Sequence, residues 1–129
     1  MTTYFFDNCV SIKYARMIRA LDVDVRHLRD LFDPDTPDEV WLPELRDSGY
    51  VVITTDRAIK TGSVTARALK ASGVTAVFLP KGFERFDKWA QAQWLIKHWP
   101  TIEAYVAKTQ TGALVQMTNS GSFTPVILK

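Results

Sequence analysis

Short runs of β-branched and aromatic residues alternate along this chain with segments that have helical spacing. One run, residues 3–6, is followed by Asp7, and the run at residues 50–55 is followed by Asp56. Strands that alternate with helices favour a parallel sheet with helices on both faces, and ligands then bind beyond the carboxyl ends of the strands. The pattern therefore predicts an α/β fold in which both aspartates lie at the binding edge.

Apolar periodicity predicts the remaining elements. The tail, residues 111–129, is typical of a terminal hairpin or an edge strand. We expect two further strands, over residues 23–28 and 74–79, and helices over residues 10–21, 36–49, 63–72 and 86–108.

Prolines and cap residues set further expectations for these helices. Proline removes a backbone donor and clashes with the preceding turn, so Pro43 predicts a kink or a restart and Pro100 a break. Thr36 and Glu39 have the spacing of a capping box around the start of the second helix. Gly73 predicts the end of the helix before it.

Length and composition restrict the class of protein. A chain of 129 residues with 47% hydrophobic and 23% charged residues is typical of one globular domain, with its core over about residues 3–108. No apolar run reaches the roughly 20 residues of a membrane-spanning helix, and the start does not resemble a signal peptide, which favours a cytoplasmic protein. The single cysteine, Cys9, excludes an internal disulfide and a thiolate zinc site.

The net charge of +2 conceals an asymmetry between the two parts of the chain. Residues 1–56 carry eleven acidic and six basic residues, whereas residues 57–129 carry three acidic and ten basic ones. One part could attract a polyanion that another part cuts, or folding could simply intermix solvated charges. Net charge therefore does not decide the function.

Three or four carboxylates are candidates for one site at the binding edge. Asp38 and Glu39 begin the second predicted helix and could approach Asp7 and Asp56. Clustered like charges require a cation or a raised pKa, and Mg²⁺ or Mn²⁺ prefers oxygen ligands. Alternatively, Asp7 and Asp56 cap the helices that follow them, and Glu39 closes a capping box. The acids of an exposed loop over residues 30–35 are most simply solvated, although Asp35 lies close enough in the sequence to be a substitute ligand.

Other chemically versatile side chains give weaker signals. Arg57 and Lys60 follow Asp56 closely enough to contact a substrate phosphate, although solvated charge explains them equally well. We assign no role to His27 or His98. The exposed tail and the tryptophan-rich helix over residues 86–108 make a homodimer plausible.

Taken together, three segments resemble a known family. They are Phe6-Asp7-Asn8-Cys9, then Pro37-Asp38-Glu39-x-Trp41-Leu42, then Val52-Ile53-Thr54-Thr55-Asp56-Arg57. In order and spacing they are similar to the PIN-like nuclease domains, especially the VapC-type toxins, over roughly residues 3–108.

The resemblance implies a three-layer α/β/α fold with a mainly parallel sheet and Mg²⁺- or Mn²⁺-dependent cleavage of RNA. It also implies a toxin role restrained by a cognate antitoxin protein. By position, Asp7, Asp38 and Asp56 match the catalytic metal ligands, with Asn8, Glu39 and Thr54 as candidate supporting residues. Longer PIN domains supply a further acid, and residues 57–83 contain none here.

Two other functional classes compete with the nuclease. A signalling receiver would accept a phosphoryl group on Asp56, but Asp7 is followed by Asn8 where a receiver has a second acid. Lys81 also follows the fourth predicted strand, where a receiver places its lysine after the fifth. A catalytically silent PIN-like module that binds RNA or protein is the remaining alternative.

Overall fold

Three consecutive buried residues form strand β1, Tyr4–Phe6. It pairs in parallel with β2, Val25–His27, on one side and with β3, Val51–Thr54, on the other. The computed structural model describes residues 2–55 and 64–126.

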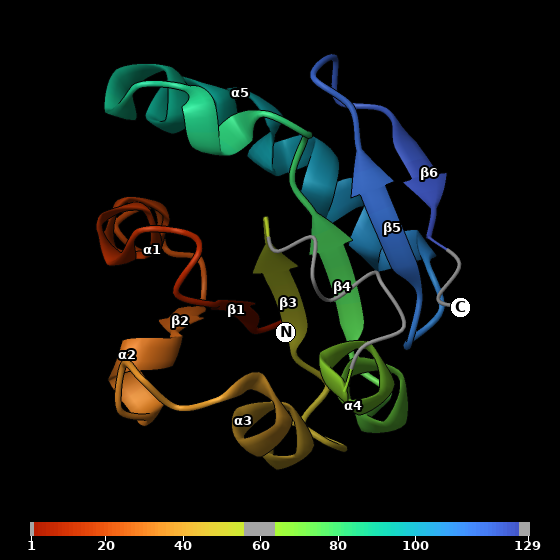
Figure 1. Ribbon diagram of the computed structural model, residues 1–129. Helices are drawn as coiled ribbons and strands as arrows, with labels where there is room; N and C mark the ends of the chain where they lie inside the picture. Colours follow the sequence, from red (N-terminus) through yellow and green to blue (C-terminus); the bar gives the residue numbers. More distant parts are fainter. Residues whose placement is uncertain (1, 56–63, 127–129) are drawn as a thin grey trace.

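The sheet continues through the second half of the chain in the order β2-β1-β3-β4-β5-β6 (Figure 1). Strand β4 pairs in parallel with β3 and β5, and only the last strand, β6, runs antiparallel to its neighbour β5. These three strands are β4 (Thr75–Phe78), β5 (Leu114–Met117) and β6 (Phe123–Pro125).

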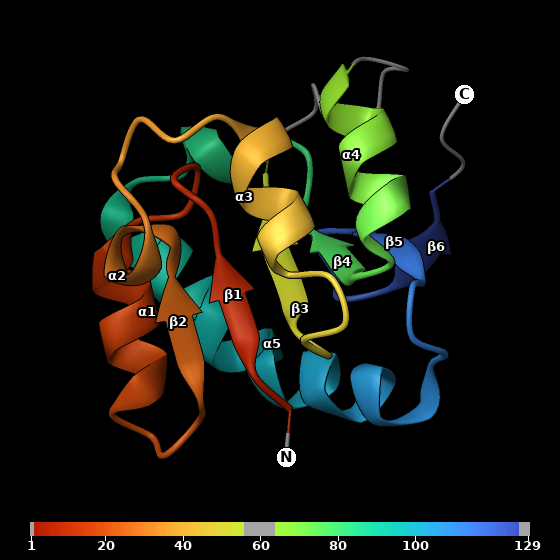
Figure 2. The ribbon, with the colours of Figure 1, turned by 90° about the horizontal axis from the view of Figure 1, so that it is seen from below.

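Helices cover both faces of this sheet, as Figure 2 shows from below. One core cluster packs α1 and α5 against the face that carries Tyr4 and Phe6, and a second packs α2, α3 and α4 against the face that carries Phe5. The alternation of neighbouring side chains between faces thus creates the two cores. The helices are α1 (Ile12–Arg19), α2 (Leu28–Leu31), α3 (Asp38–Glu44), α4 (Val64–Ser72) and α5 (Lys88–Lys108), and a short 3₁₀ turn, η2 (Phe83–Arg85), precedes α5.

This architecture confirms the predicted three-layer α/β/α fold with a mainly parallel sheet. The predicted helix end at Gly73 is also correct, since this glycine follows α4 with a φ of +68°, which glycine adopts readily. Lys81 follows β4, the fourth strand of the sequence, as expected.

The break predicted at Pro100 and the restart predicted as one outcome at Pro43 are both wrong. Helix α5 runs without interruption through Pro100, which lies on its exposed side, where solvent can satisfy the backbone carbonyl that the proline leaves unpaired. Helix α3 also contains Pro43 but ends one residue later at Glu44, so it neither restarts there nor reaches Gly49.

Two local predictions before α3 also fail. Pro37 is the N-cap of α3 and has no side-chain capping bond, while the amide of Thr36 donates to the Asp33 carbonyl in the preceding turn, so the expected capping box does not form. The expected strand over residues 23–28 ends at His27, because Leu28 begins α2, and part of the expected acidic loop is therefore helical.

The tail forms the predicted hairpin, because β5 and β6 pair as antiparallel neighbours. Val115 and Met117 on β5 are buried in the core shared with α1 and α5. Among the helices of residues 2–55 and 64–126, none combines the length and apolar character needed to span a bilayer.

Candidate active site

The connections between strands create one position where a ligand site is expected. From β1 the chain reaches β2 on one side of the sheet, then crosses to β3 on the other side and continues outward through β4 and β5. The order reverses between β1 and β3, and open α/β sheets bind ligands at such a switch point, beyond the carboxyl ends of the strands. Asp7 follows β1 directly at this point, beside Thr54 at the end of β3.

Asp7 is held by the backbone and by the neighbouring strand. Its residue is only 3% exposed. The Thr54 hydroxyl donates to Asp7 Oδ2 at 2.5 Å, and the Cys9 amide donates to Oδ1 at 3.0 Å. An ionised carboxylate only accepts hydrogen bonds, so both donors suit the charged form. The side chain is therefore fixed in orientation with its charge buried.

Helix capping does not explain Asp7. Helix α1 has Ser11 as its N-cap, and the Ser11 side chain accepts a hydrogen bond from the Lys13 amide. Asp7 instead bonds the amide two residues on, which is the geometry of an Asx turn. Of the two alternatives that the sequence leaves open for this residue, a cap on the following helix is excluded.

Asp38 begins α3 and is fixed by a buried indole. The Trp41 Nε1–H donates to Asp38 Oδ1 at 2.9 Å, and Trp41 itself is fully buried beneath the helix. In Figure 2 the first turn of α3 lies at the same end of the sheet as the arrowhead of β1. Asn8 connects the two regions, because its side-chain amide donates to the Pro34 carbonyl in the loop before α3.

The remaining predicted residues are placed less completely. Asp56, Arg57 and Lys60 lie outside the described residues, so their roles stay predictions. Glu39 is exposed on α3. Within residues 2–55 and 64–126, no group of three or more His, Cys, Asp or Glu side chains is placed to hold a metal ion. A three-carboxylate site therefore requires Asp56.

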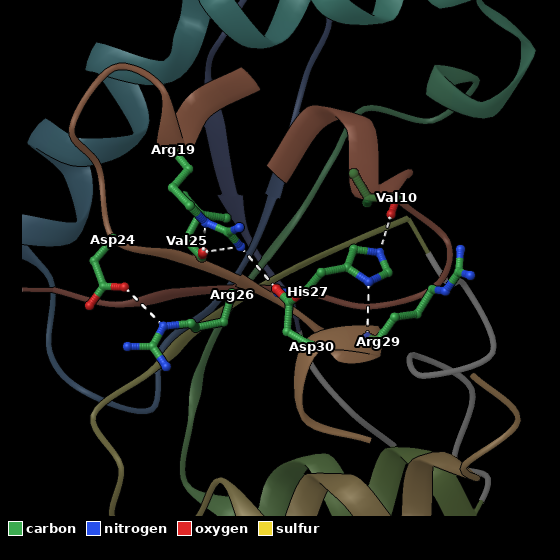
Figure 3. Close-up of polar contacts among 8 residues, drawn as sticks. All are labelled: Val10, Arg19, Asp24, Val25, Arg26, His27, Arg29 and Asp30. Atoms are coloured by element: carbon green, nitrogen blue, oxygen red, sulfur yellow. Dashed lines mark hydrogen bonds and ion pairs between the residues drawn. The ribbon is translucent and has the colours of Figure 1, made fainter. Parts of the chain in front are cut away.

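Next to Asp7, at the end of β2, the buried His27 organises a polar network (Figure 3). His27 Nδ1 accepts from the Arg29 amide at 3.1 Å, and Nε2 lies 2.8 Å from the Val10 carbonyl, to which it donates when Nδ1 accepts. Asp30 completes a capping box, since its carboxylate accepts from the His27 amide at 2.9 Å and from Arg19 at 2.9 Å.

The same contacts set the ionisation of this network. Burial lowers the pKa of His27, although the bond to the Val10 carbonyl opposes the shift. Burial would raise the pKa of Asp30, but the His27 amide and Arg19 outweigh it and lower this pKa overall. No role was predicted for His27, although Asp30 lies three residues after it, which is the spacing of a capping box.

Comparison with protein families gives a match over residues 2–81, more than half of the chain, to the family described as the PIN-like domain. This chain belongs to the PIN-like domain family. The superfamily of PIN-like domains generally consists of nucleases. The matched region of this PIN-like domain contains Asp7, Asp38 and Asp56, and the match does not single out the VapC-type toxins. Searches of curated proteins and of solved structures return no match.

Proposed function

We propose that this PIN-like domain is an endoribonuclease that hydrolyses RNA phosphodiester bonds with Mg²⁺ or Mn²⁺ held by Asp7, Asp38 and Asp56. The observation that carries the proposal is the buried Asp7 carboxylate at the switch point of the sheet, bonded by Thr54 and the Cys9 amide. A carboxylate fixed in this way has a single orientation. Membership of a superfamily of nucleases supports the same conclusion.

The chemistry of the available donors suits a hard divalent ion. A carboxylate has about four lone-pair sites, so Asp7 can accept its two hydrogen bonds and still ligate a cation. When bound, such an ion orients and deprotonates water and offsets charge on the leaving oxygen. Thr54 and Trp41 hold the carboxylates of Asp7 and Asp38 in place.

The supporting residues have proposed roles around these ligands. Asn8 braces the loop after β1 through its bond to Pro34. Arg57 and Lys60 contact the scissile phosphate, and the exposed Glu39 is a supporting residue of the site.

The decisive experiment compares two aspartates that each accept a threonine hydroxyl. Asp7→Asn removes a proposed ligand, whereas Asp24→Asn alters an acid bonded to Thr3 at the opposite end of the sheet. Loss of a metal ligand removes several kcal/mol of transition-state stabilisation, so Asp7→Asn should slow RNA cleavage about a thousandfold. Asp24→Asn should cleave like the parent protein, and Asp56→Asn should behave like Asp7→Asn.

Metal binding separates an enzyme from a silent module. An ion that binds only the native state stabilises it by about 2.7 kcal/mol at a hundred times its Kd. Thermal unfolding should therefore shift upward with Mn²⁺ in the parent protein and not in Asp7→Asn. Absence of both Mn²⁺ stabilisation and cleavage of any RNA would overturn the nuclease. Phosphorylation of Asp56 by a small phosphoryl donor would favour a receiver instead.

We further propose that the nuclease is the cytoplasmic toxin of a toxin–antitoxin pair, since PIN-like domains often have that role. Its partners are then cellular RNA, a cognate antitoxin protein and a second copy of the chain. Induced expression should arrest bacterial growth, and Asp7→Asn should relieve the arrest. Normal growth with an active enzyme would contradict the toxin role, and light scattering of the purified protein tests the homodimer.

A further inference from the structure

A cavity of about 360 Å³ lies beside Asn8, the residue that follows Asp7. Its walls come from the loop after β1, the start of α1 and the junction of β2 with α2. The polar residues that line it are Asn8, Ser11, Lys13, His27 and Arg29. Because the cavity lies next to the proposed metal site, the charge of its lining indicates what part of a substrate it can bind.

Lys13 and Arg29 are the charged residues of this lining, which contains no acid. Neither side chain makes an ion pair or hydrogen bond with another residue in the described part of the chain. In contrast, Arg19 pairs with Asp30 at 2.9 Å and Arg26 with Asp24 at 3.1 Å. The two cations that face the cavity are thus not neutralised as their neighbours around β2 are.

Hydrogen bonds hold the backbone segments that carry Lys13 and Arg29. Figure 3 shows the Arg29 side chain extending on the side of Val10, while the Asp30 carboxylate faces Arg19. The two ring nitrogens of His27 engage the Arg29 amide and the Val10 carbonyl, and so hold the backbone from which the Arg29 side chain extends. Ser11 similarly fixes the Lys13 amide. The positive lining therefore stands on a hydrogen-bonded scaffold.

We propose that this cavity binds a phosphate of the RNA strand next to the scissile one, through Lys13 and Arg29. The proposal rests on the proposed function, because it extends the path of the same substrate. Lysine and arginine bind phosphate by charge-assisted hydrogen bonds. Asn8, which directly follows Asp7, lines the cavity. An RNA strand that crosses the metal site therefore reaches this cavity as it passes toward the β2 edge of the sheet.

Binding of single-stranded RNA tests the two cations. Fluorescence anisotropy would be measured with Asp7→Asn protein in Mg²⁺, so that the RNA stays intact. Adding Lys13→Gln and Arg29→Gln should weaken binding about a hundredfold and reduce the slope of log K against log salt by about 0.7, since each neutralised phosphate of a single strand contributes about 0.7.

The matched control removes the same charges elsewhere. Arg46→Gln with Lys70→Gln changes one arginine and one lysine, both exposed, near the amino ends of β3 and β4. This pair should leave binding within about twofold, with circular dichroism and Tm as checks on folding. Equal weakening by both pairs would overturn the cavity as a phosphate site, because net charge alone would then explain the effect.

Neutral phosphates locate the contact. A set of RNAs would each carry one methylphosphonate, which removes the charge of a single phosphate. One position beside the cleaved bond should bind about tenfold more weakly, and this penalty should disappear in the Lys13→Gln, Arg29→Gln protein. Cleavage without any such coupling would overturn the pocket and leave the nuclease standing. Coupling in a protein that cuts no RNA would sustain the pocket and overturn the nuclease.

Discussion

The two ends of the sheet use the same pair of side chains in different surroundings. After β1, Asp7 accepts the hydroxyl of Thr54 from the neighbouring strand β3, and before β2, Asp24 accepts the hydroxyl of Thr3, which lies just before β1. The first pair is buried at the carboxyl end, and the second is partly exposed at the amino end.

Their surroundings determine what each acid can do. Asp24 accepts from Arg26 at 3.1 Å, its side chain is 34% exposed, and the bonds from Thr3 and Arg26 lower its pKa. An exposed ion pair of this kind contributes little to stability. Asp7 is fixed instead by a hydroxyl and an amide inside the molecule. The same threonine–aspartate pair therefore holds the backbone at the amino end of the sheet and positions a proposed metal ligand at the carboxyl end.

The largest difference between the two ends should appear when the hydroxyls of Thr54 and Thr3 are removed in turn. Thr54→Val leaves the buried Asp7 without one donor, which should destabilise the fold by about 1–3 kcal/mol. A misoriented metal ligand should also lower kcat for RNA cleavage by about ten- to a hundredfold. Cleavage would be measured per folded molecule, with Mn²⁺ affinity followed by calorimetry.

Thr3→Val is the matched control, because it removes the hydroxyl from the equivalent pair at the amino end. It should cost less than about 1 kcal/mol, since its group is partly exposed, and should leave cleavage unchanged. An equal loss of kcat in both variants would mean that the two pairs do not differ in function.

A smaller effect is expected at Asp38. Trp41→Phe removes the indole N–H that bonds this carboxylate and should lower cleavage about tenfold, while the missing ring atoms destabilise α3 packing by about 1–3 kcal/mol. Trp94→Phe provides the control, because Trp94 is also buried and donates to the Asn119 carbonyl on the other face of the sheet. Loss of stability in both with unchanged cleavage in both would remove Asp38 from the site.

The arrangement of segments far apart in the chain could be predicted from the sequence where one physical cause dominated. Tyr4–Phe6 and Val51–Ile53 form strands because their side chains pack alternately into the two cores, and parallel pairing then brings Asp7 beside Thr54. Since the carboxyl ends of parallel strands share one edge, the alternation predicted a common edge for these segments. That β1 and β3 are direct neighbours became clear only from the strand order.

Local details failed where two causes compete. Pro100 has a helix-breaking side chain, but the packing of Trp99 and Ile102 against the sheet holds α5 together around it. The capping box predicted at Thr36 does not form, because the Thr36 amide instead closes a turn by donating to the Asp33 carbonyl. His27 caps α2 through its ring. Histidine is not among the preferred cap residues, so its spacing to Asp30 was not enough to predict the role.

The pH dependence of stability should differ between His27, at the carboxyl end of β2, and Asp24, just before its amino end. Burial lowers the pKa of His27 below its usual 6.5, so the native state favours the neutral ring that accepts from the Arg29 amide. The unfolded chain therefore binds more protons as pH falls below about 6.5, and stability decreases there. The pKa of Asp24 is lowered from 3.8, so its stabilisation is complete at higher pH and is lost only as pH falls through its folded value.

Chemical denaturation between pH 3 and pH 8 would measure both effects. His27→Gln should flatten the slope of unfolding free energy against pH just below about 6.5, and Asp24→Asn should flatten it only below about 4. His98 also has a pKa lowered by burial and by Lys97, so a shallow slope should persist in His27→Gln and vanish when both histidines are replaced. An unchanged slope in His27→Gln would show that its ring titrates alike in the folded and unfolded chain. The scaffold of the phosphate cavity would then have to tolerate a protonated His27, and the bond to the Arg29 amide would not be what holds Arg29 in position.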